Sequence, residues 1–244
     1  MQLYHLILSY QNQINPKIIT DSKQKNVGKK KNSTVRISCT NIRGLNSKNK
    51  LAVKMNHLMI HLHSDIKIIV DAHADQDTIK LLNINYRQEM AQYNIIGNES
   101  RKRGVTVLIK KSCGYTTANV NLLDKENTVQ FDLISPDMTI YNIVAIYAPC
   151  KGDEGPKYWS ALHKKIYTTN PNQLLIGDFN VTLDPYLDKT EYVSDHSHVQ
   201  SRKIINSWID NEEYLDAYRQ LYPESKTYSW RWDGNIRKET DKKA

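Results

Sequence analysis

The sequence has no long apolar run and few cysteines. No uninterrupted apolar segment approaches the roughly 20 residues that cross a bilayer, which excludes an integral membrane protein. The segment from Met1 to Tyr10 is apolar, but it lacks a positive start and a small-residue cleavage site, so we expect no signal peptide. The three cysteines, Cys39, Cys113 and Cys150, form no C-x-x-C pair that would indicate zinc or a redox site. We therefore expect an intracellular protein, nuclear or cytoplasmic, in a reducing compartment.

Length and charge favour a single compact domain with a polyanionic partner. The chain has 244 residues and a mass of 28.3 kDa, a size that one α/β domain can reach. Its composition of 39% apolar and 25% charged residues is typical of a globular protein. The net charge of +8 and the pI near 9.2 favour a polyanion, and nucleic acid is the first candidate.

The first 34 residues differ in composition from the rest. The stretch from Asp21 to Thr34 holds five lysines among polar residues and has almost nothing to bury. We expect residues 1–34 to be a disordered basic leader, which serves as a solvated linker, a nuclear address or a phosphate-contacting arm. Residues 35–238 then form the domain and residues 239–244 a tail, with no internal repeat.

From residue 35 onward, short β-rich runs alternate with loops and a few helical stretches. Residues 35–39 and 66–70 have the character of strands, and residues 50–62 between them place apolar side chains on one helical face, which predicts a β-α-β unit. Further strands are predicted at residues 104–109, 115–120, 128–134, 139–147 and 173–176, and helices at residues 158–167 and 199–212. Because strands outnumber helices, we expect a mixed α/β sandwich.

The most informative segment is L-L-I-G-D-F-N at residues 174–180. An apolar strand runs into a glycine, and Asp178 and Asn180 follow two positions apart, so both can face a cleft. A carboxylate can orient or deprotonate a water, and a carboxamide can donate to a phosphate oxygen that gains charge. This pair is typical of phosphodiesterases, although Gly, Asp and Asn also form plain turns after strands.

Other short motifs stand in order around this segment. They are N-I-R-G-L at residues 41–45, V-D-A-H at 70–73, G-V-T-V-L at 104–108, Y-A-P at 147–149 and T-Y-S-W at 227–230. With G-D-F-N they resemble, in sequence order, the motifs of the endonuclease/exonuclease/phosphatase family. Their form is similar to that of LINE-type retrotransposon endonucleases, which are related to exonuclease III-like and DNase I-like enzymes.

This resemblance implies a four-layer α/β sandwich, in which two packed mixed sheets are flanked by helices. It also implies hydrolysis of a DNA phosphodiester with Mg²⁺ or Mn²⁺ as the cofactor. By the family pattern, Asn41 and Asp71 hold the metal, Asp178 positions the water, and Asn180 and Tyr147 bind the phosphate. Without the resemblance, Asn41 could only stabilise a turn and Tyr147 could only pack at a strand exit. Nothing in the sequence indicates a membrane or an obligate protein partner.

Basic and aromatic side chains outside these motifs have two readings each. Arg101, Lys102 and Arg103 form a cluster that either contacts a phosphate backbone or marks an exposed hairpin tip. Trp230 and Trp232 either stack on bases or pack in the core, and packing is the more common role.

The sequence departs from the family pattern at two places. Asp71 stands where a glutamate is usual, so its carboxylate reaches one methylene less far, and a water could bridge the gap to a metal. The family continues with S-R-I-D-like and S-D-H-like motifs, which do not follow Trp230 before Ala244. We therefore expect a domain cut before its last catalytic segment. S-D-H at residues 194–196 precedes Trp230, so the order predicts a variable loop there.

Two alternatives to an active nuclease follow from these departures. The chain could be a catalytically inactive remnant that binds nucleic acid through its basic surface, or an unstable fragment. The same chemistry could also act on a phosphoinositide or sphingolipid, but the net charge and the motif forms argue against a lipid substrate.

Overall fold

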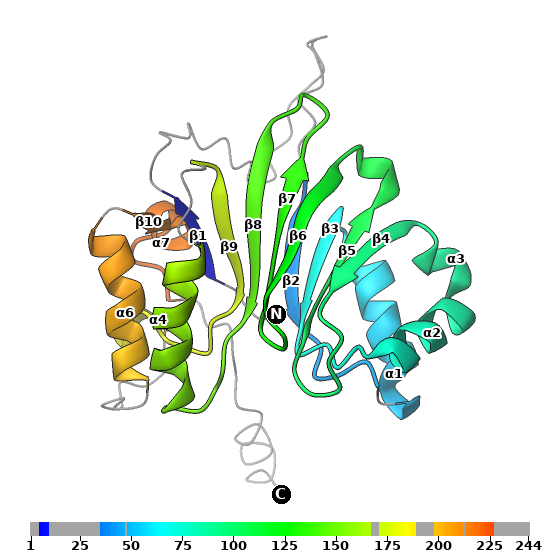
Figure 1. The fold of residues 1–244 in the computed structure, drawn as a ribbon, viewed down its shortest axis with the longest axis horizontal. Helices are drawn as coiled ribbons and strands as arrows, with labels where there is room; N and C mark the ends of the chain where they lie inside the picture. The colour runs from blue at the N-terminus through cyan, green and yellow to red at the C-terminus, as the bar shows by residue number, and fades with distance from the viewer. Residues whose placement is uncertain are drawn as a thin grey trace, which may run out of the picture.

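Two β-sheets face one another with helices on both outer sides (Figure 1). The computed structural model describes residues 5–9, 35–46, 48–166, 171–188, 198–211 and 213–226. In these residues one sheet has the strand order β2-β3-β5-β4 and the other β10-β1-β9-β8-β7-β6. The four-layer α/β sandwich expected from the sequence is therefore confirmed.

The smaller sheet is built on the predicted β-α-β unit. Strand β3 is buried along its whole length and pairs in parallel with β2 and antiparallel with β5. Helix α1 packs Leu51 and Met55 against this sheet, and Leu58 of the following π-helix continues the same face. The elements of this half are β2 (Ile37–Asn41), α1 (Lys48–Asn56), η1 (His57–His61), β3 (Ile66–Val70), α2 (Gln76–Asn85), α3 (Arg87–Met90), β4 (Tyr93–Gly97), β5 (Val105–Lys110) and η2 (Lys111–Cys113).

The larger sheet combines an antiparallel meander with one parallel pair. Strands β6, β7 and β8 run antiparallel, and β8 and β9 run parallel, with Tyr147 opposite Asp178. Its elements are β6 (Thr116–Asp124), β7 (Thr128–Ile134), β8 (Ile140–Tyr147), α4 (Glu154–Ile166), β9 (Gln173–Asp178), α5 (Pro185–Asp188), α6 (Val199–Asp210), β10 (Tyr214–Asp216) and α7 (Ala217–Leu221).

Helices α4 and α6 cover the outer face of the larger sheet (Figure 1). Trp159 of α4 is fully buried and packs its ring against Phe179 and Trp208, at centroid distances of 5.1 and 5.8 Å. Aromatic rings at such distances contribute packing beyond simple area burial. The strand that carries Asp178 is thereby fixed from its outer side.

The space between the two sheets is filled by apolar side chains from both. Ile68 and Val107 of the smaller sheet meet Phe131, Ile143 and Ile176 of the larger one in a single cluster. This core holds the two sheets together, so the loops at their ends keep a fixed relative position.

The structure corrects the expected disordered leader at one point. Residues His5–Ser9 form β1, which pairs antiparallel with β9 and with β10, so this segment belongs to the larger sheet. The apolar H-L-I-L-S stretch suits a strand that pairs with neighbours on both edges, where its backbone N–H and C=O groups find partners. The rest of residues 1–34, the S-D-H segment, Trp230, Trp232 and the tail lie outside the described residues.

Several predicted boundaries shift by a few residues, and some elements were not predicted. Helix α4 begins at Glu154 and β6 continues to Asp124, beyond the predicted ranges. Helix α2 and strands β4 and β10 were not predicted at all. No helix in the described residues is long and apolar enough to cross a membrane.

Candidate active site

The carboxyl ends of four strands bring the predicted site residues together. Asn41 ends β2, Asp71 directly follows β3, Tyr147 ends β8 and Asp178 ends β9. The amide nitrogen Nδ2 of Asn41 donates to Oδ2 of Asp178 at 3.1 Å, which joins the two sheets at this edge. Parallel pairing of β2 with β3 and of β8 with β9 places these strand ends at the same level in each sheet.

The carboxylate of Asp178 is held by two donors. Besides the Asn41 amide at Oδ2, the backbone N–H of Asn180 donates to Oδ1 at 3.1 Å. The preceding Gly177 lets the strands approach closely, since a Cβ there would lie 1.9 Å from the carbonyl oxygen of Ile146. Each carboxylate oxygen retains acceptor capacity, so Asp178 can still orient a water.

Asp71 and Tyr147 form a second pair. The Tyr147 hydroxyl is hydrogen-bonded to the Asp71 side chain, and Nε2 of His73 lies 3.0 Å from Oδ1 of Asp71. Burial raises the pKa of Tyr147 far above its usual range, and the negative charges of Asp71 and Asp178 raise this pKa further. Tyr147 therefore remains a neutral phenol at neutral pH, and its single O–H donates to the Asp71 carboxylate.

Asn180 connects the ends of β8 and β9. Its Nδ2 donates to the carbonyl oxygen of Ala148 at 2.7 Å, and its backbone is left-handed with φ of 49°. The backbone N–H of Ala148 in turn donates to the carbonyl oxygen of Asp178 at 2.9 Å. An amide nitrogen carries two hydrogens, so Asn180 keeps one donor for a phosphate oxygen.

Lys54 supports the loop that follows β2. Its Nζ donates to the carbonyl oxygen of Arg43 at 2.7 Å and to that of Gly44. Gly44 has φ of 80°, and a Cβ there would lie 2.8 Å from Nδ1 of His73. Burial lowers the pKa of Lys54, as does the charge of Lys50, while the nearby Asp71 opposes this shift. Lys54 was not predicted, because a lysine on a helix gives no sign in the sequence of what it reaches.

Left-handed backbone conformations gather at this edge. Such conformations are uncommon for residues with a side chain and often mark functional sites. In the described part of the chain, five non-glycine residues around the site have φ between 48° and 68°, namely Arg43, Asp71, His73, Arg103 and Asn180. His73, the last residue of the V-D-A-H motif, lies against Asp71, a contact that the motif alone does not predict.

The predicted basic cluster lies on the loop between β4 and β5, beside the turn that carries Asp71. The backbone N–H of His73 donates to the carbonyl oxygen of Arg103 at 2.7 Å. Arg103 forms an ion pair with Glu154 at 3.0 Å, which raises the pKa of Arg103 and connects this loop to α4. Arg101 is exposed and pairs with Asp75 at 2.8 Å, while Lys102 is exposed. Arg101 and Lys102 thus remain accessible, and Arg103 has a structural role as well.

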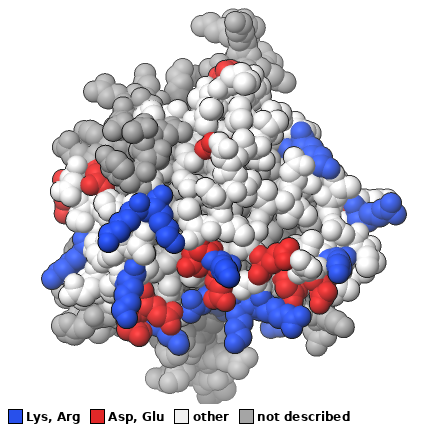
Figure 2. Space-filling model, viewed as in Figure 1, with Lys and Arg blue, Asp and Glu red and all other residues white. Residues whose placement is uncertain are grey.

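Acidic and basic side chains alternate near the lower edge of the molecule in Figure 2, where the loops after β8 and between β4 and β5 lie in Figure 1. The positive excess of the sequence is concentrated elsewhere, because residues 1–34 contain six lysines and one aspartate. Long-range attraction of a polyanion therefore depends strongly on that leader.

The side chains at this edge fit a hard divalent cation. The negative charges of Asp71 and Asp178 both raise the pKa of Tyr147, so the two carboxylates lie near the same phenol. With Oδ1 of Asn41 they provide only oxygen ligands, which Mg²⁺ and Mn²⁺ prefer. No group of three His, Cys, Asp or Glu side chains among the described residues forms a ready metal cluster. Waters would have to complete the coordination, which is usual for Mg²⁺.

Solved structures described as AP endonucleases and as a 3′ phosphatase share this fold. NExo, a 3′ phosphatase from Neisseria solved with a product DNA hairpin, is 16% identical, covers 85% of this chain and 82% of its own, and has a TM-score of 0.62. The chain shares the fold of these enzymes. An AP endonuclease from Archaeoglobus fulgidus is 14% identical, with a TM-score of 0.62 over 84% of this chain and 82% of its own. The AP endonuclease LMAP from Leishmania major is 16% identical, with a TM-score of 0.59 over 79% of this chain and 71% of its own.

The likeness to these nucleases concerns the fold, because the sequences have diverged far. No protein-family model matches the sequence, and no curated protein matches it either. The fold expected from the sequence is thus shared with these solved structures.

Proposed function

We propose that this protein is a metal-dependent phosphodiesterase that hydrolyses nucleic acid. The observation that carries the proposal is the contact of Asn41 with Asp178 across the two sheets, with Asp71 and Tyr147 paired beside it. The fold is that of enzymes described as AP endonucleases and as a 3′ phosphatase, which supports the same reaction class.

Each side chain has a role that its contacts permit. Asp178, held by Asn41 and by the backbone of Asn180, orients the attacking water and accepts its proton. The second hydrogen of Asn180 Nδ2 donates to a phosphate oxygen, which gains charge in the transition state. Tyr147 donates to another phosphate oxygen when its single O–H turns from Asp71 to the bound phosphate.

Asn41 and Asp71 would hold a Mg²⁺ or Mn²⁺ ion, which supplies Lewis-acid polarisation of the phosphate and neutralises the leaving oxygen. Asp71 is shorter than the glutamate of the family motif. Its left-handed backbone and its bond to Tyr147 hold the carboxylate beside a phenol whose pKa the charge of Asp178 also raises, which supports this assignment. Nε2 of His73 lies 3.0 Å from Oδ1 of Asp71, which helps to hold this carboxylate in place.

We further propose that the protein is a DNA endonuclease of retrotransposon origin that acts inside the cell. The support comes from the N-x-R-G-L, Y-A-P and G-D-F-N forms, the basic leader and the accessible Arg101 and Lys102. In a parent element, such a nick would prime reverse transcription. The alternative is a protein that binds nucleic acid without cutting it. It is favoured by Arg101 and Lys102, which are exposed and could bind phosphates without any catalysis.

A plasmid-nicking assay with Mg²⁺ tests the proposal. We expect the wild type to relax supercoiled DNA and Asp178→Asn to lose about 10²- to 10⁴-fold in rate, the usual cost of removing a positioned acid–base group. Asp210→Asn is the matched control, because Asp210 is exposed at the end of α6, away from the site. Nicking by Asp178→Asn at the wild-type rate would refute the assignment. Tight DNA binding without any nicking would select the binding protein.

A further inference from the structure

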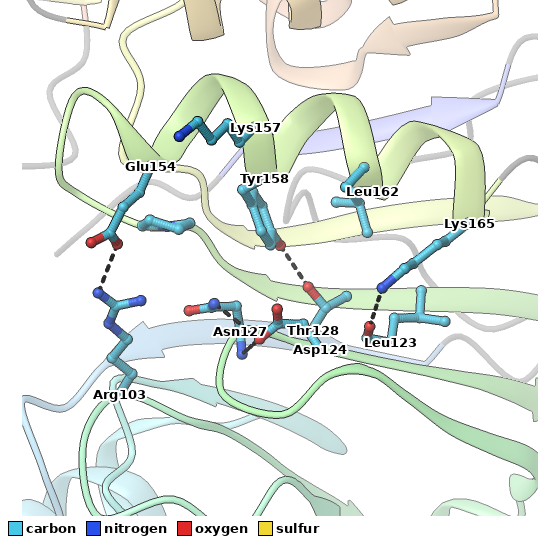
Figure 3. Close-up of a pocket in the computed structure, with 12 residues that line it drawn as sticks. Arg103, Leu123, Asp124, Asn127, Thr128, Glu154, Lys157, Tyr158, Leu162 and Lys165 are labelled. Carbon is cyan, nitrogen blue, oxygen red and sulfur yellow. Dashed lines mark hydrogen bonds and ion pairs between the residues drawn. The ribbon is translucent and has the colours of Figure 1, made fainter.

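A pocket of about 300 Å³ lies between helix α4 and the turn that joins β6 to β7. This volume is at the lower end of the range for small-molecule sites. Figure 3 shows α4 above the pocket and the turn below it, with Arg103 and Glu154 closing one end and Leu123 and Lys165 at the other. None of its lining residues except Arg103 belongs to the site predicted from the sequence.

A buried acceptor without a partner lines this pocket. Asn127 is 6% exposed, and both its backbone N–H and its Nδ2 donate to Oδ1 of Asp124 at 3.0 Å. The Asp124 carboxylate thereby fixes the orientation of the amide, because a flipped amide would place two oxygens face to face. Among the described residues no donor reaches Oδ1 of Asn127, although buried acceptors are normally paired. A ligand with a hydrogen-bond donor would satisfy it.

The walls favour a flat, largely apolar ligand. Leu123, Pro149, Ala161, Leu162 and the ring of Tyr158 supply the apolar surface. The Tyr158 hydroxyl shares a 2.5 Å hydrogen bond with Oγ1 of Thr128, so its ring is fixed in place. Rigid apolar walls with one convergent polar group are typical of sites that recognise aromatic rings.

The charged residues around the pocket indicate which end of a ligand lies outside. Arg103 is occupied by Glu154, and Nζ of Lys165 donates to the carbonyl oxygen of Leu123 at 2.8 Å. Lys157 is exposed at the rim and is available to a phosphate. A phosphate inside the pocket would face the Asn127 oxygen and the carboxylates of Asp124 and Glu154, which disfavours an anion there.

The pocket shares its walls with the proposed active site. The backbone N–H of Tyr147 donates to the carbonyl oxygen of Asn127 at 2.8 Å, and Pro149 follows Tyr147 by two positions. Arg103 likewise lines the pocket and accepts from the backbone of His73. A nucleotide strand bound at the site therefore passes close to this pocket.

We propose that the pocket is a nucleobase subsite that accepts a base carrying an amino group, whose N–H donates to Oδ1 of Asn127. The choice of a nucleotide ligand rests on the proposed function. The ring lies between Tyr158 and the apolar wall, and the attached sugar-phosphate faces Lys157. Stacking against rigid apolar and aromatic side chains is a common means of binding single-stranded bases.

The test is an NMR titration of the ¹⁵N-labelled full chain with deoxyadenosine monophosphate and with its N6,N6-dimethyl analogue. We expect saturable shifts of the Asn127 side-chain amide with the first nucleotide. The dimethyl analogue, which has no amino hydrogens, should bind about tenfold more weakly, because the buried oxygen stays unpaired. Ala161→Trp fills the pocket and should abolish the shifts. Ser160→Trp, on an exposed neighbouring position of α4 that does not line the pocket, should leave them unchanged.

The outcomes separate this subsite from the catalytic proposal. Nucleotide binding by a wild type that does not nick DNA would keep the subsite and reject the nuclease. Equal affinity for both nucleotides, absence of shifts at Asn127, or equal loss in both tryptophan variants would overturn the subsite even if nicking is found.

Discussion

Nδ2 of Asn41 lies 3.1 Å from Oδ2 of Asp178, although the two residues are 137 positions apart in the sequence. This hydrogen bond joins the ends of β2 and β9, which belong to different sheets. The core between the sheets fixes their relative position, so the site depends on packing far from its own side chains.

Gly177 is required for the strand that carries Asp178. In Gly177→Ala the new Cβ would lie 1.9 Å from the carbonyl oxygen of Ile146, so β8 and β9 would have to separate. We expect a loss of about 4 kcal/mol or more in the free energy of unfolding, measured by urea denaturation. Gly152→Ala is the control, because nothing lies within 4 Å of its added Cβ. Equal stability of the two variants would show that β9 does not approach β8 as described.

Asp75 stabilises the start of α2. Its Oδ1 accepts from the backbone N–H of Thr78 at 3.0 Å and from the Thr78 hydroxyl at 2.7 Å. These bonds, together with Arg101, hold the pKa of Asp75 below its usual range. We expect Asp75→Ala to lower the free energy of unfolding by about 1 kcal/mol at pH 7.

The same contact has a defined pH dependence. A lowered pKa in the folded state means that the stabilisation is present above the ordinary value of about 4 and is lost as pH falls through the folded value. The difference between wild type and Asp75→Ala should therefore shrink below about pH 4. A difference that stays constant as the solution is acidified would reject this role for the carboxylate.

Tyr158 makes stability fall in alkaline solution. Burial raises its pKa, so the unfolded chain releases the phenol proton at about pH 10 while the folded chain retains it. Stability should fall as pH rises above that value. Tyr158→Phe loses the hydrogen bond to Thr128, about 1 kcal/mol at pH 7, but has no phenol to ionise. Urea unfolding from pH 7 to pH 10.5 should show the gap between the two proteins narrowing, and a constant gap would contradict this.

The lysines of the leader should govern the salt dependence of DNA binding. Each phosphate contact contributes about 0.9 to the slope of log K against log salt. Replacing Lys23, Lys25, Lys29, Lys30 and Lys31 with Gln should therefore reduce the slope by up to about 4 if all of them contact phosphates. Fluorescence anisotropy over a salt series measures it. A slope that does not change would assign binding to the domain, where Arg101 and Lys102 lie exposed.

Strong periodicity in the sequence predicted elements that the structure contains. Residues 66–70 and 128–134 match β3 and β7 at both ends, because the first run is apolar except for Lys67 and the second alternates from Thr128 to Leu133. Helix α2 was not predicted because only Thr78 and Leu82 of it are buried, so its apolar periodicity is weak. Strand β1 was assigned to a disordered leader, because its place depends on β9 and β10, which are distant in sequence.

Motif spacing predicted which residues would meet, but not how they are oriented. The five proposed metal and catalytic residues do come to one edge, including Asp71 with its shorter side chain. The turn that aims Asp71 at Tyr147 has a left-handed backbone, which no local pattern in the sequence indicates. The sequence likewise does not predict the pocket beside α4, since Asn127 and Ala161 are distant in sequence and belong to no motif.

The most direct test is to locate Mn²⁺ by anomalous scattering in crystals of the full chain. We expect one strong peak at the edge where β2, β3 and β9 end, bonded to oxygens of Asn41 and Asp71 and facing Asp178. The peak should vanish in the double variant Asn41→Ala, Asp71→Ala. Mn²⁺ bound only elsewhere, or no Mn²⁺ at this edge under saturating conditions, would contradict the central claim that these side chains hold a cation against a phosphate.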